Sequence, residues 1–207
     1  MALSGGGTPE RLYQLLTQAP YVNQISWERV HLFWGDERLV PPDAPGSNYK
    51  QVADILLSQV PVPAENVHRM KGEMSPETAV ADYIHQLQQT ALPPRQWPRL
   101  DFALMGLGSD GHTASLFPGS IPPEEQSRPV RLATANYEGR PAQRLTLTPL
   151  IFNEARHLVF LVMGGNKAAT VKAVLEGPIQ PEIYPAQRIQ PHNGRLTWLL
   201  DEAAAGQ

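Results

Sequence analysis

The 207-residue sequence lacks cysteine altogether and has no long hydrophobic run. The absence of cysteine excludes disulfide bonds and thiolate metal sites, and the six histidines include no His-Glu-x-x-His spacing. The longest apolar strand-like run, residues 158–163, is far too short to span a membrane. The first residues do not resemble a signal peptide. The sequence therefore predicts a cytoplasmic protein with no metal site and no membrane partner.

The sequence also lacks an excess of charge of either sign. Its 17 basic and 20 acidic residues are interspersed and leave a net charge of -3. Without a basic patch or tail, the chain shows no sign of binding nucleic acid. The length is sufficient to bury a sizeable core, and neither an internal repeat nor a charged linker divides it. We therefore expect a single domain over residues 1–207 with a small-molecule ligand.

Proline, by contrast, is abundant, with 21 residues, about twice the average usage. The prolines cluster between segments of regular periodicity and so mark connections. Between them, the patterns predict helices near residues 11–16, 48–58, 76–89 and 168–175, and strands near 30–34, 102–107, 130–133, 144–147 and 158–163. This alternation predicts an α/β fold with a single doubly wound, mainly parallel sheet and helices on both faces, similar to the Rossmann fold.

The most informative segment, Gly-Leu-Gly-Ser-Asp-Gly-His-Thr-Ala at residues 106–114, follows the apolar residues 102–105. Ligands of open α/β sheets bind beyond the carboxyl ends of the strands, and glycine lets the backbone approach a ligand closely. Asp110 and His112 are therefore candidate catalytic residues. The alternative is structural: Asp110 and Gly111 form a tight turn and His112 caps a following helix.

A second glycine-rich loop, Ser-Gly-Gly-Gly-Thr-Pro at residues 4–9, precedes a helical pattern. Pro9 suits the first position of that helix and Thr8 its N-cap, so the amides of Gly6, Gly7 and Thr8 would point into one small volume, as in phosphate sites. The loop matches neither the Walker motif nor the dinucleotide fingerprint, and no cofactor is expected. The alternative is a flexible chain end.

Two cations stand at other predicted strand ends. Arg38 follows residues 30–34 in the triplet Asp-Glu-Arg, and its planar guanidinium suits bidentate recognition of phosphate or carboxylate. Lys167 follows residues 158–163, where an ammonium group can hold a phosphate as a point charge. Ordinary solvated surface charges are the alternative for both residues.

Taken together, residues 4–9, 35–38, 47–49, 105–118 and 164–167 resemble the 6-phosphogluconolactonase family, within the glucosamine/galactosamine-6-phosphate isomerase superfamily. The resemblance covers nearly the whole chain and is most specific in Asp-Gly-His-Thr-Ala-Ser-Leu-Phe-Pro at residues 110–118. It implies hydrolysis of 6-phospho-D-glucono-1,5-lactone to 6-phospho-D-gluconate, the second step of the oxidative pentose phosphate pathway. Gly7 departs from the pattern, because the family has serine there.

The resemblance also implies roles for individual residues. His112 would be the general base that activates water, and Asp110 would orient it. The groups expected to bind the substrate phosphate are Gly6, Gly7, Thr8, Arg38 and Lys167. Asp36 is a further candidate for positioning the substrate.

Two other functions remain open. Glucosamine-6-phosphate deaminase shares the scaffold and an Asp-Gly-His turn, but it uses a glutamate at the place of Phe117 and a tyrosine at the place of Arg38. A non-catalytic module that binds sugar phosphates is the second alternative. The intact turn at His112 argues against such a module, and the abrupt start of the chain argues for it.

The N-terminus is too short to supply a complete strand before the glycine-rich loop at residues 4–9. Only three residues precede Ser4, whereas a strand usually needs about five or six. The sequence thus predicts a fold that is apparently truncated at its N-terminus, and a fragment, a misplaced start and a real short form all fit. We expect lower stability and a more mobile glycine loop than in a version extended upstream.

Overall fold

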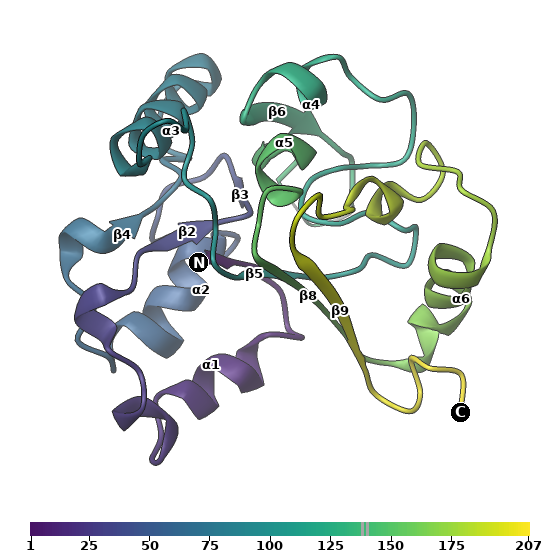
Figure 1. The fold of residues 1–207 in the computed structure, drawn as a ribbon, viewed down its shortest axis with the longest axis horizontal. Coiled ribbons are helices and arrows are strands. Elements are labelled where there is room, and N and C mark those ends of the chain that lie inside the picture. The colour runs from purple at the N-terminus through teal and green to yellow at the C-terminus, as the bar shows by residue number, and fades with distance from the viewer. Residues whose placement is uncertain (138, 140) are drawn as a thin grey trace.

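Six parallel strands form the main sheet of this protein, in a computed structural model that describes residues 1–137, 139 and 141–207 (Figure 1). Their order across the sheet is β4-β2-β1-β5-β8-β9. The strands are β1 (Ala2–Leu3), β2 (Leu32–Trp34), β4 (Val67–His68), β5 (Ala103–Met105), β8 (His157–Val162) and β9 (Arg195–Leu200). The predicted α/β fold with a mainly parallel sheet is confirmed.

The order of the strands reverses between β1 and β5. The chain first adds β2 and β4 on one side of β1, and then β5, β8 and β9 on the other side. In doubly wound sheets the crevice at such a reversal, beyond the carboxyl ends of the strands, is where ligands bind. Ser4 follows β1 and Gly106 follows β5. Both glycine-rich loops therefore leave the sheet at the reversal.

The helices are α1 (Glu10–Leu16), α2 (Asn48–Val52), α3 (Pro76–Thr90), α4 (Glu124–Ser127), α5 (Pro149–Phe152) and α6 (Ala168–Glu176), with a π-helical turn (Ala53–Leu57) that continues α2. The helices α1, α2, α3 and α6 lie close to their predicted positions, whereas the short helices α4 and α5 were not predicted. Short 3-10 helices span Tyr21–Asn23, Trp27–Arg29, Ala64–Asn66, Gly165–Lys167 and Pro185–Arg188. The predicted N-cap Thr8 is wrong by one residue, because Pro9 is the N-cap of α1 and already has helical dihedral angles.

A second sheet is antiparallel and three-stranded in the order β3-β7-β6. The predicted strands near residues 130–133 and 144–147 therefore exist, but they lie in this sheet and not in the single, mainly parallel sheet that the sequence predicts. Its strands are β3 (Asp36–Arg38), β6 (Val130–Thr134) and β7 (Gln143–Leu147). Gly35 separates β2 from β3, and its carbonyl accepts a hydrogen bond of 2.8 Å from the amide of Leu147. The chain thus passes from the carboxyl end of β2 directly into the second sheet.

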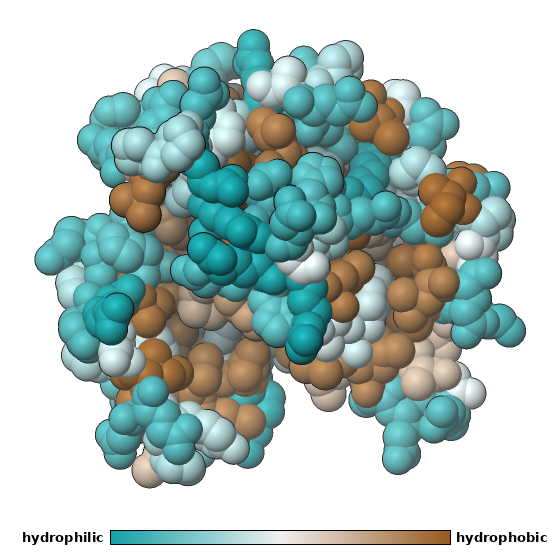
Figure 2. Space-filling view, in the orientation of Figure 1, coloured by the Kyte–Doolittle hydropathy of each residue, from teal (hydrophilic) through white to brown (hydrophobic). Residues whose placement is uncertain are grey.

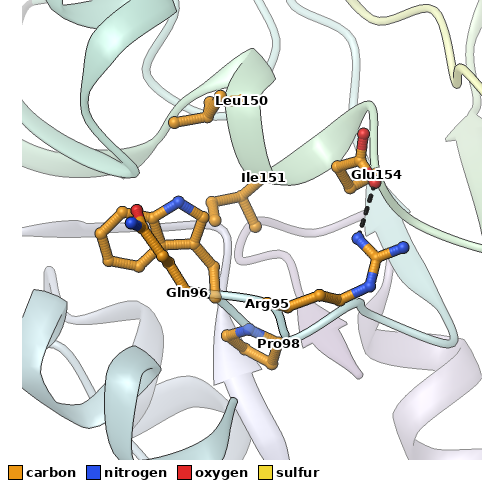
Figure 3. A pocket seen from close by; sticks show the side chains of 7 residues that line it. Arg95, Gln96, Pro98, Leu150, Ile151 and Glu154 are labelled. Carbon is orange, nitrogen blue, oxygen red and sulfur yellow. Dashed lines mark hydrogen bonds and ion pairs between the residues drawn. The ribbon is translucent and has the colours of Figure 1, made fainter. Parts of the chain in front are cut away.

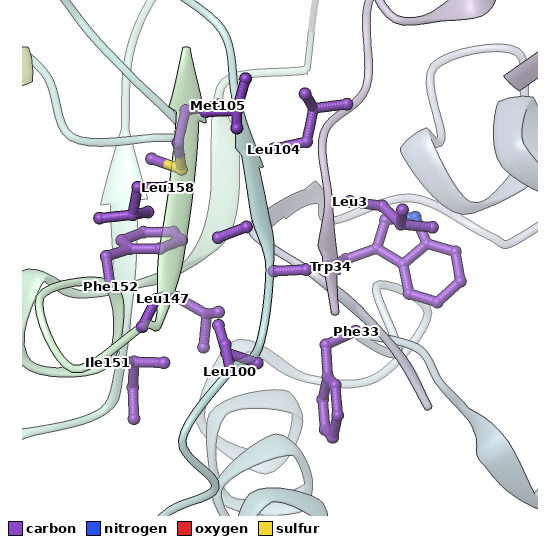
Figure 4. Packing of buried hydrophobic residues seen from close by; sticks show 14 of the residues in the cluster. Leu3, Phe33, Trp34, Leu100, Leu104, Met105, Leu147, Ile151, Phe152 and Leu158 are labelled. Atoms are coloured by element: carbon purple, nitrogen blue, oxygen red, sulfur yellow. The ribbon is translucent and has the colours of Figure 1, made fainter. Parts of the chain in front are cut away.

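The core lies around the strands of the main sheet (Figure 4). Leu3, Trp34 and Leu158 have no exposed surface, and Phe152 of α5 is also fully buried (Figure 4). Parallel strands covered on both faces are apolar at successive positions, which explains the hydrophobic segments in the sequence. Even the two residues of β1 are fully buried, because β1 pairs with both β2 and β5. The expected loss of stability at this strand stays a prediction.

Exposed apolar side chains occur on the surface among hydrophilic ones (Figure 2). Among the larger ones, Leu196 and Leu199 belong to the edge strand β9, and Leu175 belongs to α6. The edge strand β9 therefore exposes two leucine side chains to solvent. Within the described part of the chain, no helix has the length and apolarity that crossing a membrane requires.

Candidate active site

Asp110 and His112 form a hydrogen-bonded pair on the turn after β5. Oδ1 of Asp110 lies 2.5 Å from Nδ1 of His112 and also accepts a hydrogen bond of 3.1 Å from the backbone amide of His112. The side chains are only partly exposed, at 36% for Asp110 and 22% for His112. Because Nδ1 faces the carboxylate, Nε2 is the ring nitrogen left to act on a ligand.

The carboxyl group of Asp110 stays ionised at neutral pH. Burial by itself would raise its pKa, but hydrogen bonds from His112 and Tyr137 outweigh burial and hold the pKa well below its usual range. The group is thus a hydrogen-bond acceptor and cannot itself serve as an acid near neutral pH. Asp110 can therefore fix the orientation of the imidazole while His112 carries the proton.

Two glycines allow this turn to form. A Cβ atom on Gly108 would lie 2.1 Å from Nδ1 of His112 and 2.5 Å from Oδ1 of Asp110. Gly111 has a φ of +83°, and a Cβ atom there would lie 2.8 Å from Cδ1 of Tyr184. The Gly-x-Asp-Gly-His pattern therefore reflects the space that the paired side chains occupy.

Substitution of Gly108 by alanine is expected to lower kcat by about 10²-fold, because a displacement of about 1 Å in a catalytic group can have that effect. The matched control is Gly106→Ala, since a Cβ atom there would meet only Oγ of Ser4, at the ordinary contact distance of 3.7 Å. Steady-state kinetics and melting temperatures of both variants test this. Equal activity of the two variants would contradict the packing argument.

Neighbouring elements hold the turn in place. Thr170 in α6 donates a hydrogen bond of 2.7 Å to the carbonyl of Ser109, and the amide of Ala186 donates one of 3.0 Å to the carbonyl of Gly111. Hydrogen bonds thus restrain both halves of the turn. The position of His112 is therefore determined by the main sheet, α6 and the segment around residue 186 together.

Asp36, the candidate for positioning the substrate, is buried, with 7% of its surface exposed. Its Oδ2 accepts a hydrogen bond of 2.6 Å from Oγ of Ser115, and its Oδ1 accepts one of 3.3 Å from Asn48. Ser115 comes three residues after His112 in the sequence. The carboxylate therefore anchors the segment that follows the turn, and a direct role with substrate stays a prediction.

The first glycine-rich loop is held by Gln51, which the sequence analysis did not identify. Oε1 of Gln51 accepts a hydrogen bond of 2.9 Å from the amide of Gly6, and its Nε2 donates bonds of 2.9 Å to the carbonyl of Gly6 and 2.7 Å to Glu10. The amide of Gly6 is thus already occupied. Among the described residues, the amides of Gly7 and Thr8 have no hydrogen-bond acceptor.

Glu37 connects this loop to the second sheet. Its carboxylate, 2% exposed, accepts hydrogen bonds of 2.7 Å from the amides of Arg38, Asn48 and Tyr49, and one of 2.9 Å from Ser47. Burial raises the pKa of Glu37, and these hydrogen bonds oppose the rise. Glu37 thereby fixes the start of α2, the helix that carries Gln51.

The two predicted phosphate ligands with positive charge come from different elements of the fold. Arg38 is the last residue of β3, and Lys167 ends the 3-10 helix after β8. Nη1 of Arg38 donates a hydrogen bond of 2.6 Å to the carbonyl of Gly46, while its buried Nε has no acceptor among the described residues. Lys167 follows β8, Thr8 follows β1 and His112 follows β5, each after the carboxyl end of the strand, whereas Arg38 follows β2 only after the whole of β3.

Three residues that were not predicted as site residues lie around His112 or on the rings that contact it. The rings of Phe117 and Tyr137 lie with their centroids 5.2 Å and 5.6 Å from the imidazole. The guanidinium of Arg144 lies 5.5 Å from the Phe117 ring centroid and 5.6 Å from that of Tyr137. Of these three residues, only Phe117 belongs to the sequence motif at residues 110–118. Tyr137 and Arg144 come from the region of the second sheet, and nothing local in the sequence connects them to His112.

Two hollows on the surface lie away from these residues. One, of about 330 Å³, lies beside the ion pair of Arg95 and Glu154, which are 2.9 Å apart (Figure 3). Trp97 also lines it. The other, of about 790 Å³, is lined by residues before the strands, including His31 and Phe102. No predicted site residue lines either hollow. No cluster of three or more metal-binding side chains occurs in the described parts of the chain.

Comparison with known proteins gives concordant results. A family model described as glucosamine-6-phosphate isomerases/6-phosphogluconolactonase matches residues 1–198. A 6-phosphogluconolactonase of Haemophilus influenzae is 36% identical over 204 residues, which are 99% of this chain and 85% of that protein. The crystal structure of a devB protein has a TM-score of 0.90 at 35% identity, covering 99% of this chain and 85% of that one. A monomeric glucosamine-6-phosphate deaminase has a TM-score of 0.84 at 23% identity, covering 99% and 86%, and so shares the fold.

Proposed function

The chain belongs to the family of glucosamine-6-phosphate isomerases and 6-phosphogluconolactonases, and we propose that it hydrolyses 6-phospho-D-glucono-1,5-lactone with His112 as general base. The observation that carries this proposal is the Asp110–His112 pair, which leaves Nε2 available at the carboxyl end of β5. This pair stands where the strand order reverses. The predicted extent of one domain, residues 1–207, and the cytoplasmic location stay predictions.

The reaction follows from the roles of the two side chains. Nε2 of His112 removes a proton from water while the water oxygen attacks the lactone carbonyl carbon, which gives a tetrahedral intermediate and an imidazolium. The intermediate collapses when the bond between that carbon and the ring oxygen breaks, and the ring oxygen takes the proton back from Nε2. Asp110 remains a carboxylate throughout and stabilises the imidazolium through Nδ1.

The phosphate group would bind at the neighbouring strand ends. Gly7 and Thr8 supply amides that have no acceptor among the described residues, and Arg38 and Lys167 supply positive charge. Gly6 supports the loop through Gln51, so its own amide must leave Gln51 before it can contact phosphate. Binding energy from the phosphate would fix the lactone carbonyl against the water.

Substitution of Gln51 by leucine is expected to raise KM for the phosphorylated lactone about 10-fold with little change in kcat. The reason is that two hydrogen bonds to Gly6, each worth about 0.5–1.5 kcal/mol, hold the loop in one conformation. Lys50→Ala is the matched control, because Lys50 precedes Gln51 in α2 and forms a surface ion pair with Asp54. Steady-state kinetics that give an unchanged KM for Gln51→Leu would remove Gln51 from the phosphate site.

The deaminase alternative is disfavoured at Phe117. The position at which the deaminase is expected to have a catalytic glutamate holds an aromatic ring packed on His112. The test compares two substrates: freshly prepared 6-phosphogluconolactone, with product formation measured above spontaneous opening, and glucosamine 6-phosphate, with ammonia release measured. We expect turnover of the lactone and no ammonia. Ammonia release would favour the deaminase, and binding without turnover would favour the non-catalytic module.

A further inference from the structure

We propose that Tyr137 is a positioning residue for the catalytic pair, because its hydroxyl holds one oxygen of Asp110 and thereby directs the other oxygen to His112. The inference rests on the proposed role of His112 as general base. Tyr137 lies between β6 and β7 of the second sheet, 25 residues after His112 in the sequence. The resemblance on which the site residues were predicted assigns no role to this position.

The hydrogen bonds give each oxygen of Asp110 its own donor. Oη of Tyr137 donates a hydrogen bond of 2.5 Å to Oδ2, while Nδ1 of His112 lies 2.5 Å from Oδ1. Rotation of the carboxylate would break both contacts. Oη also lies 3.3 Å from Nδ1 of His112. The three polar groups therefore form a closed arrangement in which the orientation of the carboxylate is fixed from two sides.

Aromatic packing fixes the position of the hydroxyl. The ring of Tyr137 packs at 5.6 Å against His112 and at 5.8 Å against Phe117, with interplanar angles of 41° and 53°. The guanidinium of Arg144, a residue only 3% exposed, lies 5.6 Å from the Tyr137 ring centroid. Tilted rings and a cation near a ring face are favourable geometries. The second sheet thus brings Tyr137 against the turn and restrains its ring.

This arrangement matters when His112 accepts a proton. The imidazolium that forms must keep donating from Nδ1 to Asp110 so that Nε2 stays directed at the ring oxygen of the lactone. Without the bond from Tyr137, only the contacts of Oδ1 with His112 would hold the carboxylate, and Nε2 would be less firmly directed. The hydroxyl of Tyr137 contacts Asp110, and the predicted phosphate groups lie on other segments of the chain, so its loss should affect kcat and leave KM nearly unchanged.

The test uses Tyr137→Phe, which removes the hydroxyl and keeps the ring. We expect kcat to fall about 10-fold with little change in KM, since hydrogen bonds to charged groups are worth about that factor. The NMR resonance of the Nδ1 proton of His112 should also shift. Tyr83→Phe is the matched control, because Tyr83 is fully buried and its hydroxyl forms bonds of 2.9 Å and 3.1 Å with the backbone of Trp34. That variant should lose stability without the same loss of kcat.

A double-mutant cycle separates positioning from a general structural effect. If Tyr137 acts through Asp110, the Tyr137→Phe change should have little further effect on kcat in an Asp110→Asn background. Additive effects in the two backgrounds, or a wild-type kcat and an unshifted Nδ1 resonance in Tyr137→Phe, would overturn the inference. If the wild-type chain does not hydrolyse the lactone, the proposed function fails. The Nδ1 resonance then still decides whether Tyr137 controls the pair.

Discussion

Replacement of His112 by asparagine is expected to lower kcat by about 10²–10⁴-fold, the usual contribution of a positioned general base. Asparagine is similar in size and still able to hydrogen-bond with Asp110, but its amide cannot accept a proton from water. KM should change little, because the predicted phosphate contacts lie on other loops. Of the changes considered, this one should have the largest effect on turnover.

The assay for this variant couples formation of 6-phosphogluconate to a chromogenic reaction and subtracts spontaneous opening of the lactone. His85→Asn is the control, because His85 is an exposed histidine of α3 and takes no part in the proposed site. Melting temperatures show whether either variant is unfolded. Turnover in His112→Asn equal to that of the wild type would remove His112 from the mechanism.

Loss of the phosphate ligands should have the second-largest effect. Lys167→Ala and Arg38→Ala are each expected to lower kcat/KM for the phosphorylated lactone about 10- to 100-fold, as expected for the loss of a charged hydrogen bond. Hydrolysis of unphosphorylated gluconolactone should stay nearly unchanged. Because Arg38 also bonds to the carbonyl of Gly46, its variant needs a separate measurement of stability.

Lys172→Ala serves as the control for these variants, because Lys172 is an exposed lysine of α6. Its kcat/KM should match that of the wild type on both lactones. The informative quantity is the ratio of kcat/KM for the two lactones in each variant. An equal loss on both lactones in Lys167→Ala and Arg38→Ala would refute a role in binding phosphate.

The main sheet could be predicted from sequence because its strands are short apolar segments bounded by turns. Residues 102–107 and 158–163 overlap β5 and β8 for this reason. In the second sheet, β6 and β7 overlap the predicted strands near residues 130–133 and 144–147, but the sequence did not indicate that they form a separate sheet. The third strand, β3, was not predicted, because it consists of Asp36, Glu37 and Arg38, whose composition does not favour a strand. Those residues become extended through pairing with β7, more than a hundred positions away in the sequence. Pairing over such a distance leaves no local periodicity.

The site shows the same division between local and distant contacts. The glycine pattern around His112 was visible in the sequence, but only the structure shows that Asp110 contacts the imidazole and that Gly108 must lack a Cβ atom. Tyr137 was missed, because a tyrosine in a connection between strands has no distinguishing local context. Gln51 was not predicted because it binds the backbone of Gly6. Every residue type has a backbone amide, so such a contact cannot be recognised from the sequence.

Acid release from freshly prepared 6-phosphogluconolactone, followed at constant pH as a function of protein concentration, is the direct test of lactone hydrolysis by this chain. Hydrolysis of the lactone releases one proton as the carboxylate forms, so the signal reports the proposed reaction itself. We expect the rate to rise in proportion to the concentration of the wild-type chain and to fall close to the spontaneous rate for His112→Asn. A rate equal to spontaneous opening at every concentration of the wild-type chain would contradict the proposed function.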